Sequence, residues 1–263
     1  MSEFTHSGVI PRLESRRSCQ EIACYRLHTH ERFSIGLVDS GTTVFTGAGE
    51  SSVRLAAGDV VLIPAGHVHA CNPDRGRWRY QMIQADQDWI AGLLASSASD
   101  LLDGITVFRQ RSVHRRFSEL NDLLFDGVGV SAERIEAEFR GALGDCDRHA
   151  PDRRMAPAGE GELLSTLEPV LERLRDDETN PPLGELAALA GMDRFQLIRA
   201  MKQATGMAPL AWRQNHRVVA ARDMLREGRS QAETAHALGF ADQSHFHRVF
   251  RAHVAASPGA YRG

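Results

Sequence analysis

Three histidines have the types and the spacing of a metal or small-ligand site. His28 and His30 are separated by one residue, so an extended strand would place both side chains on one face. His69 lies in a second β-rich region and, on a neighbouring strand, would complete a group of three imidazoles able to hold Zn²⁺. Three interpretations stay open: contact with a ligand, metal binding and a structural role. We expect ligand contact, with no metal and no cofactor.

Two aromatic residues further along could contribute to the same site. Trp78 and Tyr80 alternate with polar residues and therefore share one face of a predicted strand. They either line a pocket with the histidines or belong to the apolar core. We include both as candidate ligand contacts.

Short β-rich runs surround these residues. Between residues 33 and 82 the runs FSIGLV, TTVF, VRL, VVLI and WRYQMI alternate with turns rich in Gly, Asp, Asn and Ser. This spacing predicts an antiparallel β-barrel or sandwich enclosing a ligand-sized cavity. Gly58 and Gly66 are expected at turns that need a positive φ.

A helical hairpin is expected after the strands. Apolar residues at helical spacing predict one helix around residues 111–126 and a second beginning at the N-cap Ser131. The apolar stripe of the hairpin packs either on the barrel of the same chain or on a second copy, which would make a dimer. Residues 146–161, rich in Pro, Gly and charge, are interpreted as a linker.

Charge is unevenly distributed along the 263 residues. The whole chain carries 31 Lys and Arg against 34 Asp and Glu, which argues against nucleic acid. From Leu183 onward, however, we count 11 basic and 6 acidic residues in the printed sequence, a basic module typical of a nucleic-acid-binding end. Neither a membrane-spanning run nor a secretory signal is evident, and four scattered cysteines favour the cytoplasm.

The basic module contains two similar segments. Residues 183–202 and 232–251 each have the pattern of a short helix, a turn with Gly191 or Gly239, and a second helix opened by Asp193 or Asp242. This is the pattern of a helix-turn-helix, and two such units can enter successive major grooves of DNA. Guanidinium, amide and aromatic side chains on the outer faces suit guanine, adenine and thymine edges or phosphates. The expected DNA contacts are Arg194, Phe195, Ile198, Arg199, Lys202, Gln243, Ser244, His247, Arg248 and Arg251.

The last segment is specific enough to indicate a family. The run GFADQSHFHRVFR at 239–251, followed by SPGAYR at 257–262, resembles the signature of the AraC/XylS transcription regulators. In the first half, Gly58, Pro64, Gly66 and His69 match the second motif of the cupin fold. The resemblance implies an α+β protein with an N-terminal cupin-like antiparallel barrel followed by helices, and a C-terminal all-α domain with two helix-turn-helix motifs.

The resemblance also implies a division of labour among four regions. These are an effector-binding domain at 1–110, a helical hairpin suited to dimerisation at 111–145, the linker at 146–161 and an AraC-type DNA-binding domain at 162–263. The implied partners are promoter or operator DNA, a small-molecule effector, a second copy of the chain and, for an activator, RNA polymerase.

The chain departs from these family patterns at four positions. Ser34 stands near the place of the cupin carboxylate ligand, which lowers the expectation of a metal. Ala255 stands where the regulators usually have Gly, at a cost of about 1 kcal/mol if the backbone is left-handed. Gln231 and Thr234 replace aliphatic residues before Gly239 and are expected to loosen that helix.

We therefore expect a cytoplasmic, effector-controlled DNA-binding regulator that is not an enzyme. The alternative is a metal-dependent cupin enzyme with an appended helical domain, based on His28, His30 and His69. A third interpretation gives the barrel a role in oligomerisation alone.

Overall fold

The computed structural model describes residues 2–21, 25–48, 51–127, 129–155, 161–176 and 180–262. Its N-terminal part contains two antiparallel sheets. The larger has the order β1-β2-β8-β3-β6-β9-β10, and the smaller has the order β5-β4-β7. The strands are β1 Ser2–His6, β2 Glu14–Gln20, β3 Phe33–Ser40, β4 Thr42–Thr46, β5 Ser52–Ala56, β6 Val60–Ile63, β7 Ala70–Pro73, β8 Trp78–Ala85, β9 Ile105–Phe108 and β10 Arg153–Met155.

Each face of the larger sheet covers a separate apolar core. In β6, Val60 and Leu62 pack beneath the helices, whereas Val61 and Ile63 pack with Phe45 of β4 in the second core between the sheets. The run VVLI is apolar throughout because both of its faces are buried. The predicted antiparallel sheet domain is confirmed as two sheets packed on each other.

The strands extend beyond the segment recognised in the sequence. β1 and β2 precede Phe33 and add one edge of the larger sheet, with β2 paired along β8. At the opposite edge, β10 lies within the stretch expected as a linker and pairs with β9. Residues 156–160 of that stretch lie outside the described residues. The N-terminal unit therefore recruits chain from both sides of its predicted strands.

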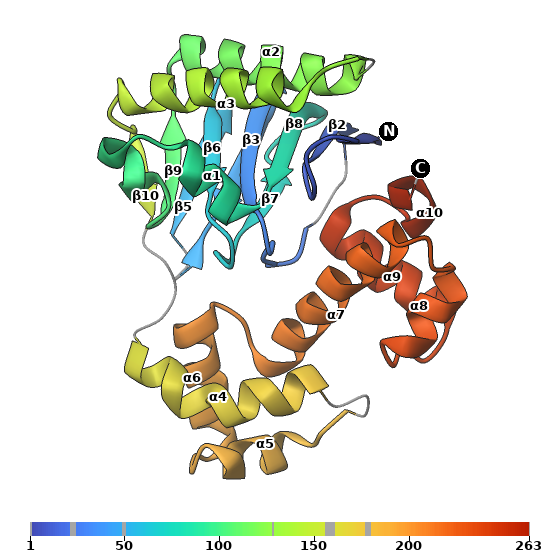
Figure 1. Ribbon diagram of the computed structural model, residues 1–263. Helices are drawn as coiled ribbons and strands as arrows, with labels where there is room; N and C mark the ends of the chain where they lie inside the picture. The colour runs from blue at the N-terminus through green and yellow to red at the C-terminus, as the bar shows by residue number, and fades with distance from the viewer. Residues whose placement is uncertain are drawn as a thin grey trace.

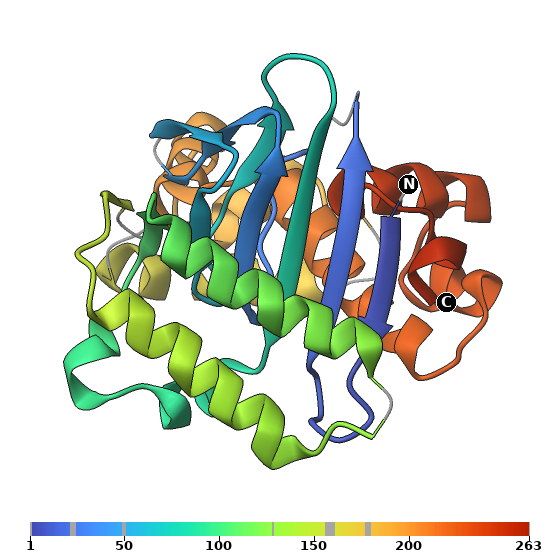
Figure 2. The same cartoon turned by 90° about the horizontal axis from the view of Figure 1, so that it is seen from above.

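The predicted helical hairpin is confirmed. Helices α2 (Arg111–Asp126) and α3 (Ala132–Asp147) run side by side over one face of the larger sheet (Figure 1, Figure 2). The side chain of Ser131 accepts a hydrogen bond from the backbone of Arg134, as an N-cap does. Phe117 and Phe139 are fully buried in the core beneath the hairpin, so its apolar stripe is covered by the same chain. Helices α1 (Gln87–Leu93) and η2 (Ser96–Leu101) flank this core.

The C-terminal part is all helical and has two lobes. One lobe contains α4 (Gly161–Asp176), α5 (Leu183–Leu189) and α6 (Arg194–Thr205), and the other contains α8 (Gln231–Ala237), α9 (Gln243–Val254) and α10 (Pro258–Arg262). Helix α7 (Pro209–Arg226) joins them and passes beneath the sheet domain (Figure 1). Among the described residues, no helix is long and apolar enough to cross a membrane.

Both helix-turn-helix units contain the turn glycine and the N-cap aspartate that the sequence predicts. Gly191 and Gly239 each have φ 64°, and Asp193 and Asp242 each cap the following helix with a side-chain oxygen. Ala255 is left-handed at φ 51°, so the cost expected for a non-glycine residue applies. Gln231 accepts a hydrogen bond from His247, and the fully buried Thr234 donates one to Ser230.

Candidate effector pocket and DNA-binding helices

A cavity of about 70 Å³ lies between the two sheets and the C-terminal helices. This exceeds several-fold the ~10–15 Å³ that one buried water requires. Strands β2, β3, β6 and β8 supply much of the wall, and α7, α9 and α10 close it with Asn215, Val218, Val219, Arg222, His253, Val254 and Tyr261. The cavity is thus shared between the sheet domain and the second helix-turn-helix lobe.

The three histidines meet in this cavity. His28 and His69 form an antiparallel bridge in which each backbone N–H donates to the other carbonyl at 2.9 Å. Residues opposite each other in such a bridge project to the same side, and His30 follows His28 by two residues. Possible ligand atoms of the three imidazoles all lie within 4.8 Å of one another. We call His28, His30 and His69 the histidine trio.

Burial keeps the histidine trio uncharged at neutral pH. Burial lowers the pKa of His28 and His30 well below the usual value, and neighbouring imidazoles lower both further. Burial also lowers the pKa of His69 to about 4. Each neutral ring therefore has one N–H donor and one nitrogen lone pair.

Hydrogen bonds decide which nitrogen holds the proton. Nδ1 of His28 donates to the Arg26 carbonyl at 2.7 Å, and Nδ1 of His69 donates to the His67 carbonyl at 2.9 Å. His30 is different, because its Nδ1 lies 3.1 Å from an Arg222 nitrogen, which can only donate. The lone pair is therefore on Nε2 in His28 and His69 and on Nδ1 in His30.

The aromatic candidates Trp78 and Tyr80 also line the cavity. Their rings stack with centroids 4.3 Å apart, and the Tyr80 hydroxyl hydrogen-bonds that of Tyr25. The indole N–H of Trp78 is buried without a hydrogen-bond partner among the described residues. A buried donor of this kind costs about 1–3 kcal/mol unless an acceptor fills the cavity.

Arg16 of β2 adds a positive charge that the sequence analysis did not identify. Its guanidinium donates to the Ser18 hydroxyl and the Val254 carbonyl, each at 2.6 Å, and lies 5.2 Å from the ring centroid of Tyr80. Within the described ranges, no carboxylate is within ion-pair distance of this guanidinium. Its Nη2 also donates to the hydroxyls of Ser2 and Tyr25, each at 3.3 Å. Arg16 therefore brings a positive charge without a carboxylate partner to the cavity while it also contacts α9.

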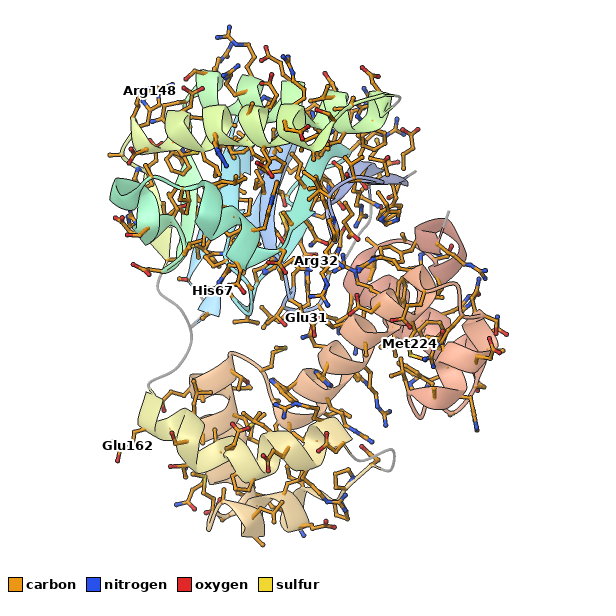
Figure 3. All side chains as sticks on the ribbon, in the orientation of Figure 1. Glu31, Arg32, His67, Arg148, Glu162 and Met224 are labelled. Carbon is orange, nitrogen blue, oxygen red and sulfur yellow. The ribbon has the colours of Figure 1, made fainter. Side chains whose placement is uncertain are left out.

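A buried ionic network joins the sheet domain to α7 and α10. Glu14 of β2 is 4% exposed and accepts hydrogen bonds from Arg222 and from the Tyr261 hydroxyl, the latter at 3.0 Å. It also forms an ion pair with Arg226 at 3.0 Å. The guanidinium of Arg32 also belongs to this network and lies 3.1 Å from Glu14 and 3.6 Å from Asp223. Figure 3 shows Arg32 at the end of the sheet domain that faces the C-terminal helices. We call Glu14, Arg32, Arg222, Arg226 and Tyr261 the Glu14 network.

Both the carboxylate of Glu14 and the guanidinium of Arg222 are ionised in the Glu14 network. Burial raises the pKa of Glu14, but Arg222 and Arg226 lower it by more, so the pKa falls below its usual value. Burial lowers the pKa of Arg222, but Tyr261 and Glu14 raise it by more. Removing one partner from such a pair leaves an uncompensated buried charge, which costs about 3–5 kcal/mol.

The expected DNA contacts lie on α6 and α9 and are mostly accessible. On α6, Arg194, Arg199 and Lys202 are exposed, and Phe195 is 76% exposed. Ile198 is half-buried and lines a groove with Leu210 and Pro182. The first recognition helix thus presents both cations and apolar surface.

On α9, the exposed residues are Gln243, Ser244, Arg248 and Arg251. His247 is half-buried and its Nε2 lies 2.6 Å from the Gln231 side chain, which ties it to α8. Arg217 of α7 donates to the carbonyl of Gly239 at 3.0 Å and so holds the turn of this unit. A sheet domain with a shared cavity and two such units defines a ligand-responsive DNA-binding protein.

Comparisons with known proteins agree with this class. Residues 17–143 match the AraC-like ligand binding domain, and residues 186–263 match a helix-turn-helix domain. The arabinose operon regulatory protein of Salmonella typhimurium is 26% identical over 250 residues, which cover 88% of this chain and 83% of that protein. YbfI, an HTH-type transcriptional regulator of Bacillus subtilis, is 23% identical over 83% of this chain and 80% of its own length.

Solved structures show the same fold over the whole chain. ToxT from Vibrio cholerae with a bound unsaturated fatty acid aligns over 98% of this chain and 97% of its own, with a TM-score of 0.58 and 11% identity. The chain belongs to the AraC/XylS family of transcription regulators. It is a DNA-binding regulator with a ligand-binding domain, and the cupin-enzyme alternative is not favoured.

Proposed function

We propose that an acidic small molecule bound in the shared cavity controls how the second helix-turn-helix lobe is held against the sheet domain. The observation that supports this is the composition of the cavity wall, which includes both Trp78 of β8 and Val254 of α9. A ligand touching both parts binds their docked and undocked arrangements unequally, which is the condition for coupling. The signal would then reach α9 directly.

The cavity favours an anion with an apolar body. Its charged lining comprises Arg16, Arg222 and Glu14, and Glu14 is already engaged by Arg222. Arg16 donates to neutral groups only, so its charge favours an anionic ligand, and the unpaired indole N–H of Trp78 can donate to an acceptor such as a carboxylate. ToxT offers a parallel, since it has been solved with an unsaturated fatty acid and with an arylbutenoic acid.

Fluorescence anisotropy of labelled promoter DNA, with and without probe ligands, tests this proposal. The probes are an unsaturated fatty acid and an arylbutenoic acid, each paired with the corresponding alcohol. We expect the two acids, but not the two alcohols, to change the affinity for DNA. Arg16→Met should abolish the response to the acids. Arg17→Met is the matched control, because Arg17 projects to the other face of β2 toward Asp122 and Phe125. Equal responses to acids and alcohols would contradict an anion site.

The DNA contacts are part of the same proposal. We assign base or phosphate contact to Arg194, Phe195, Ile198, Arg199 and Lys202 on α6, and to Gln243, Ser244, His247, Arg248 and Arg251 on α9. The exposure of all of these side chains except the half-buried Ile198 and His247 supports this assignment, as does the positive charge of both helices. Affinity should fall steeply with salt concentration, as phosphate contacts require.

The remaining roles follow from a regulator of this type. The proposed regions are effector binding at 1–110, a helical hairpin at 111–145 and DNA binding at 162–263. The stretch 146–161 expected as a linker contains strand β10, which belongs to the sheet domain. We assign dimerisation to the outward face of α2 and α3, which is charged through Arg134, Glu136, Glu138 and Arg140. Sedimentation velocity at low and high salt tests this contact. We further assign a cytoplasmic location, contact with RNA polymerase if the protein activates, and no catalytic activity.

A further inference from the structure

The geometry of the histidine trio fits a metal ion, a second kind of ligand for the cavity in which the acidic molecule is proposed to bind. Zn–N bonds of about 2.0–2.1 Å place tetrahedral nitrogen ligands roughly 3.4 Å apart. The imidazole ligand atoms already lie within 4.8 Å of one another, so each ring has to move by less than about 1 Å. The backbone bridge between His28 and His69 fixes two of the three positions.

Two of the rings are already oriented as metal ligands. The Nδ1 hydrogen bonds of His28 to the Arg26 carbonyl and of His69 to the His67 carbonyl leave each Nε2 lone pair free. A second-shell acceptor on the distal ring nitrogen is the usual device that fixes the orientation of a metal-ligating histidine. Burial of the two rings does not by itself require that both donate from Nδ1 to a backbone carbonyl.

The third ring carries a different partner. Arg222 donates to Nδ1 of His30 at 3.1 Å, so His30 uses its lone pair on a guanidinium. A metal ion could bind to Nδ1 of His30, which would take the lone pair that now accepts from Arg222. It could also bind to Nε2, but the proton would then be on Nδ1 and would face the N–H group of Arg222. In both cases the metal and Arg222 cannot use His30 together.

We propose that His28, His30 and His69 bind one divalent transition-metal ion, and that the ion competes with Arg222 for His30. Three imidazoles without a carboxylate suit zinc, cobalt, nickel or copper rather than magnesium or calcium. The cavity leaves room for a fourth ligand. Arg222 belongs to α7, so occupancy of the metal site weakens one contact that holds α7 against the sheet domain.

Metal analysis of the full-length protein, produced without a polyhistidine tag, tests the site. After dialysis against a chelator, Co²⁺ is titrated while visible absorption is recorded, and Zn²⁺ is then added as competitor. We expect one ion per chain and a loss of affinity of at least about 100-fold in His28→Ala and His69→Ala. His236→Ala, an exposed histidine of α8, is the control and should bind as the wild type does.

The wild-type protein also gives an answer that needs no variant. X-ray absorption of the loaded protein should show several imidazole ligands and no sulfur, although Cys71 lines the same cavity. Absence of stoichiometric binding for Zn²⁺, Co²⁺, Ni²⁺ and Cu²⁺, or sulfur ligation, would overturn the site. These measurements involve no DNA and stand apart from the test of the anion pocket.

The competition with Arg222 has its own test. In Arg222→Met, Glu14 keeps Arg226 and Arg32 as partners, and circular dichroism checks that the fold is retained. We expect Co²⁺ to bind about 10-fold more tightly, because binding no longer displaces a hydrogen bond. Unchanged or weaker binding in this variant would refute the coupling while leaving the metal site itself intact.

Discussion

The two helix-turn-helix units share a framework but differ in what they present and in what holds them. Helices α6 and α9 both have 12 residues, and α9 begins 49 positions after α6, at Gln243 against Arg194. In this register Phe195 corresponds to Ser244 and Ile198 to His247, so apolar surface in the first unit is replaced by polar groups in the second. The cations Arg199 and Arg248 correspond directly.

The second unit is attached to the sheet domain by hydrogen bonds. The Val254 carbonyl accepts from Arg16 at 2.6 Å, the Ala255 carbonyl accepts from Gln20 at 3.2 Å, and the Ala252 carbonyl accepts from the Arg26 backbone at 3.1 Å. For the first unit, Gly206 lies against Val68 so closely that an added Cβ would be 2.2 Å from a methyl group. Among the described residues, hydrogen bonds thus join the second unit to the sheet domain, whereas the contact of Gly206 in the first unit is one of packing.

The largest expected effect comes from breaking the Glu14 network. Glu14→Gln leaves Arg222, Arg226 and Arg32 without their shared counter-charge, which should cost about 3–5 kcal/mol of unfolding free energy. Urea denaturation measures the loss, and hydrogen exchange should show α9 and α10 loosening more than α6. Glu3→Gln, an exposed carboxyl on the neighbouring strand β1, is the control. A loss below about 0.5 kcal/mol would show that the network does not hold the second unit.

The second effect depends on pH. A histidine with a lowered folded pKa stabilises the protein above its unfolded value of about 6.5, and this contribution is lost as the pH falls toward the folded value. For His69 the folded value is about 4, so up to about 3 kcal/mol should disappear between pH 6.5 and 4. In His69→Asn, unfolding free energy should depend less on pH in this window, whereas the exposed His236→Asn should follow the wild type. Identical pH profiles for the wild type and His69→Asn would rule out this origin.

The third prediction compares the cations in register. Arg199→Ala and Arg248→Ala should each weaken operator binding by about 1–3 kcal/mol, roughly 10- to 100-fold, because each removes a base or phosphate contact. If both read bases, each variant should relax sequence preference at a different half-site, which binding selections on randomised DNA would reveal. Arg54→Ala removes an exposed arginine of β5 in the sheet domain and should leave affinity unchanged. A loss of specificity at the same bases in both variants would contradict separate readout.

Sequence reasoning succeeded where signals are local. Turn glycines, Asp N-caps and helical periodicity predicted both units, and one-residue spacing correctly placed His28 and His30 together. The Glu14 network was missed because Glu14 and Arg222 lie 208 residues apart in the chain, and neither belongs to a local pattern. Strand β10 was missed for a similar reason, since three residues within a Pro- and Gly-rich stretch acquire strand character only by pairing with β9.

The smallest predicted effect concerns the end of the second recognition helix. Ala255 and Gly206 both terminate their helices in the left-handed region, at φ 51° and 72°, but only glycine occupies it without a Cβ penalty. Ala255→Gly should therefore raise the unfolding free energy by about 0.5–1 kcal/mol, after allowance for the greater freedom of glycine in the unfolded chain. The reverse change, Gly206→Ala, should destabilise by more, because its Cβ would also collide with Val68. A gain at Ala255 without a change in DNA affinity would show that the strained cap affects stability alone. Reduced effector response in the same variant would show instead that the strain helps the second unit to leave the sheet domain.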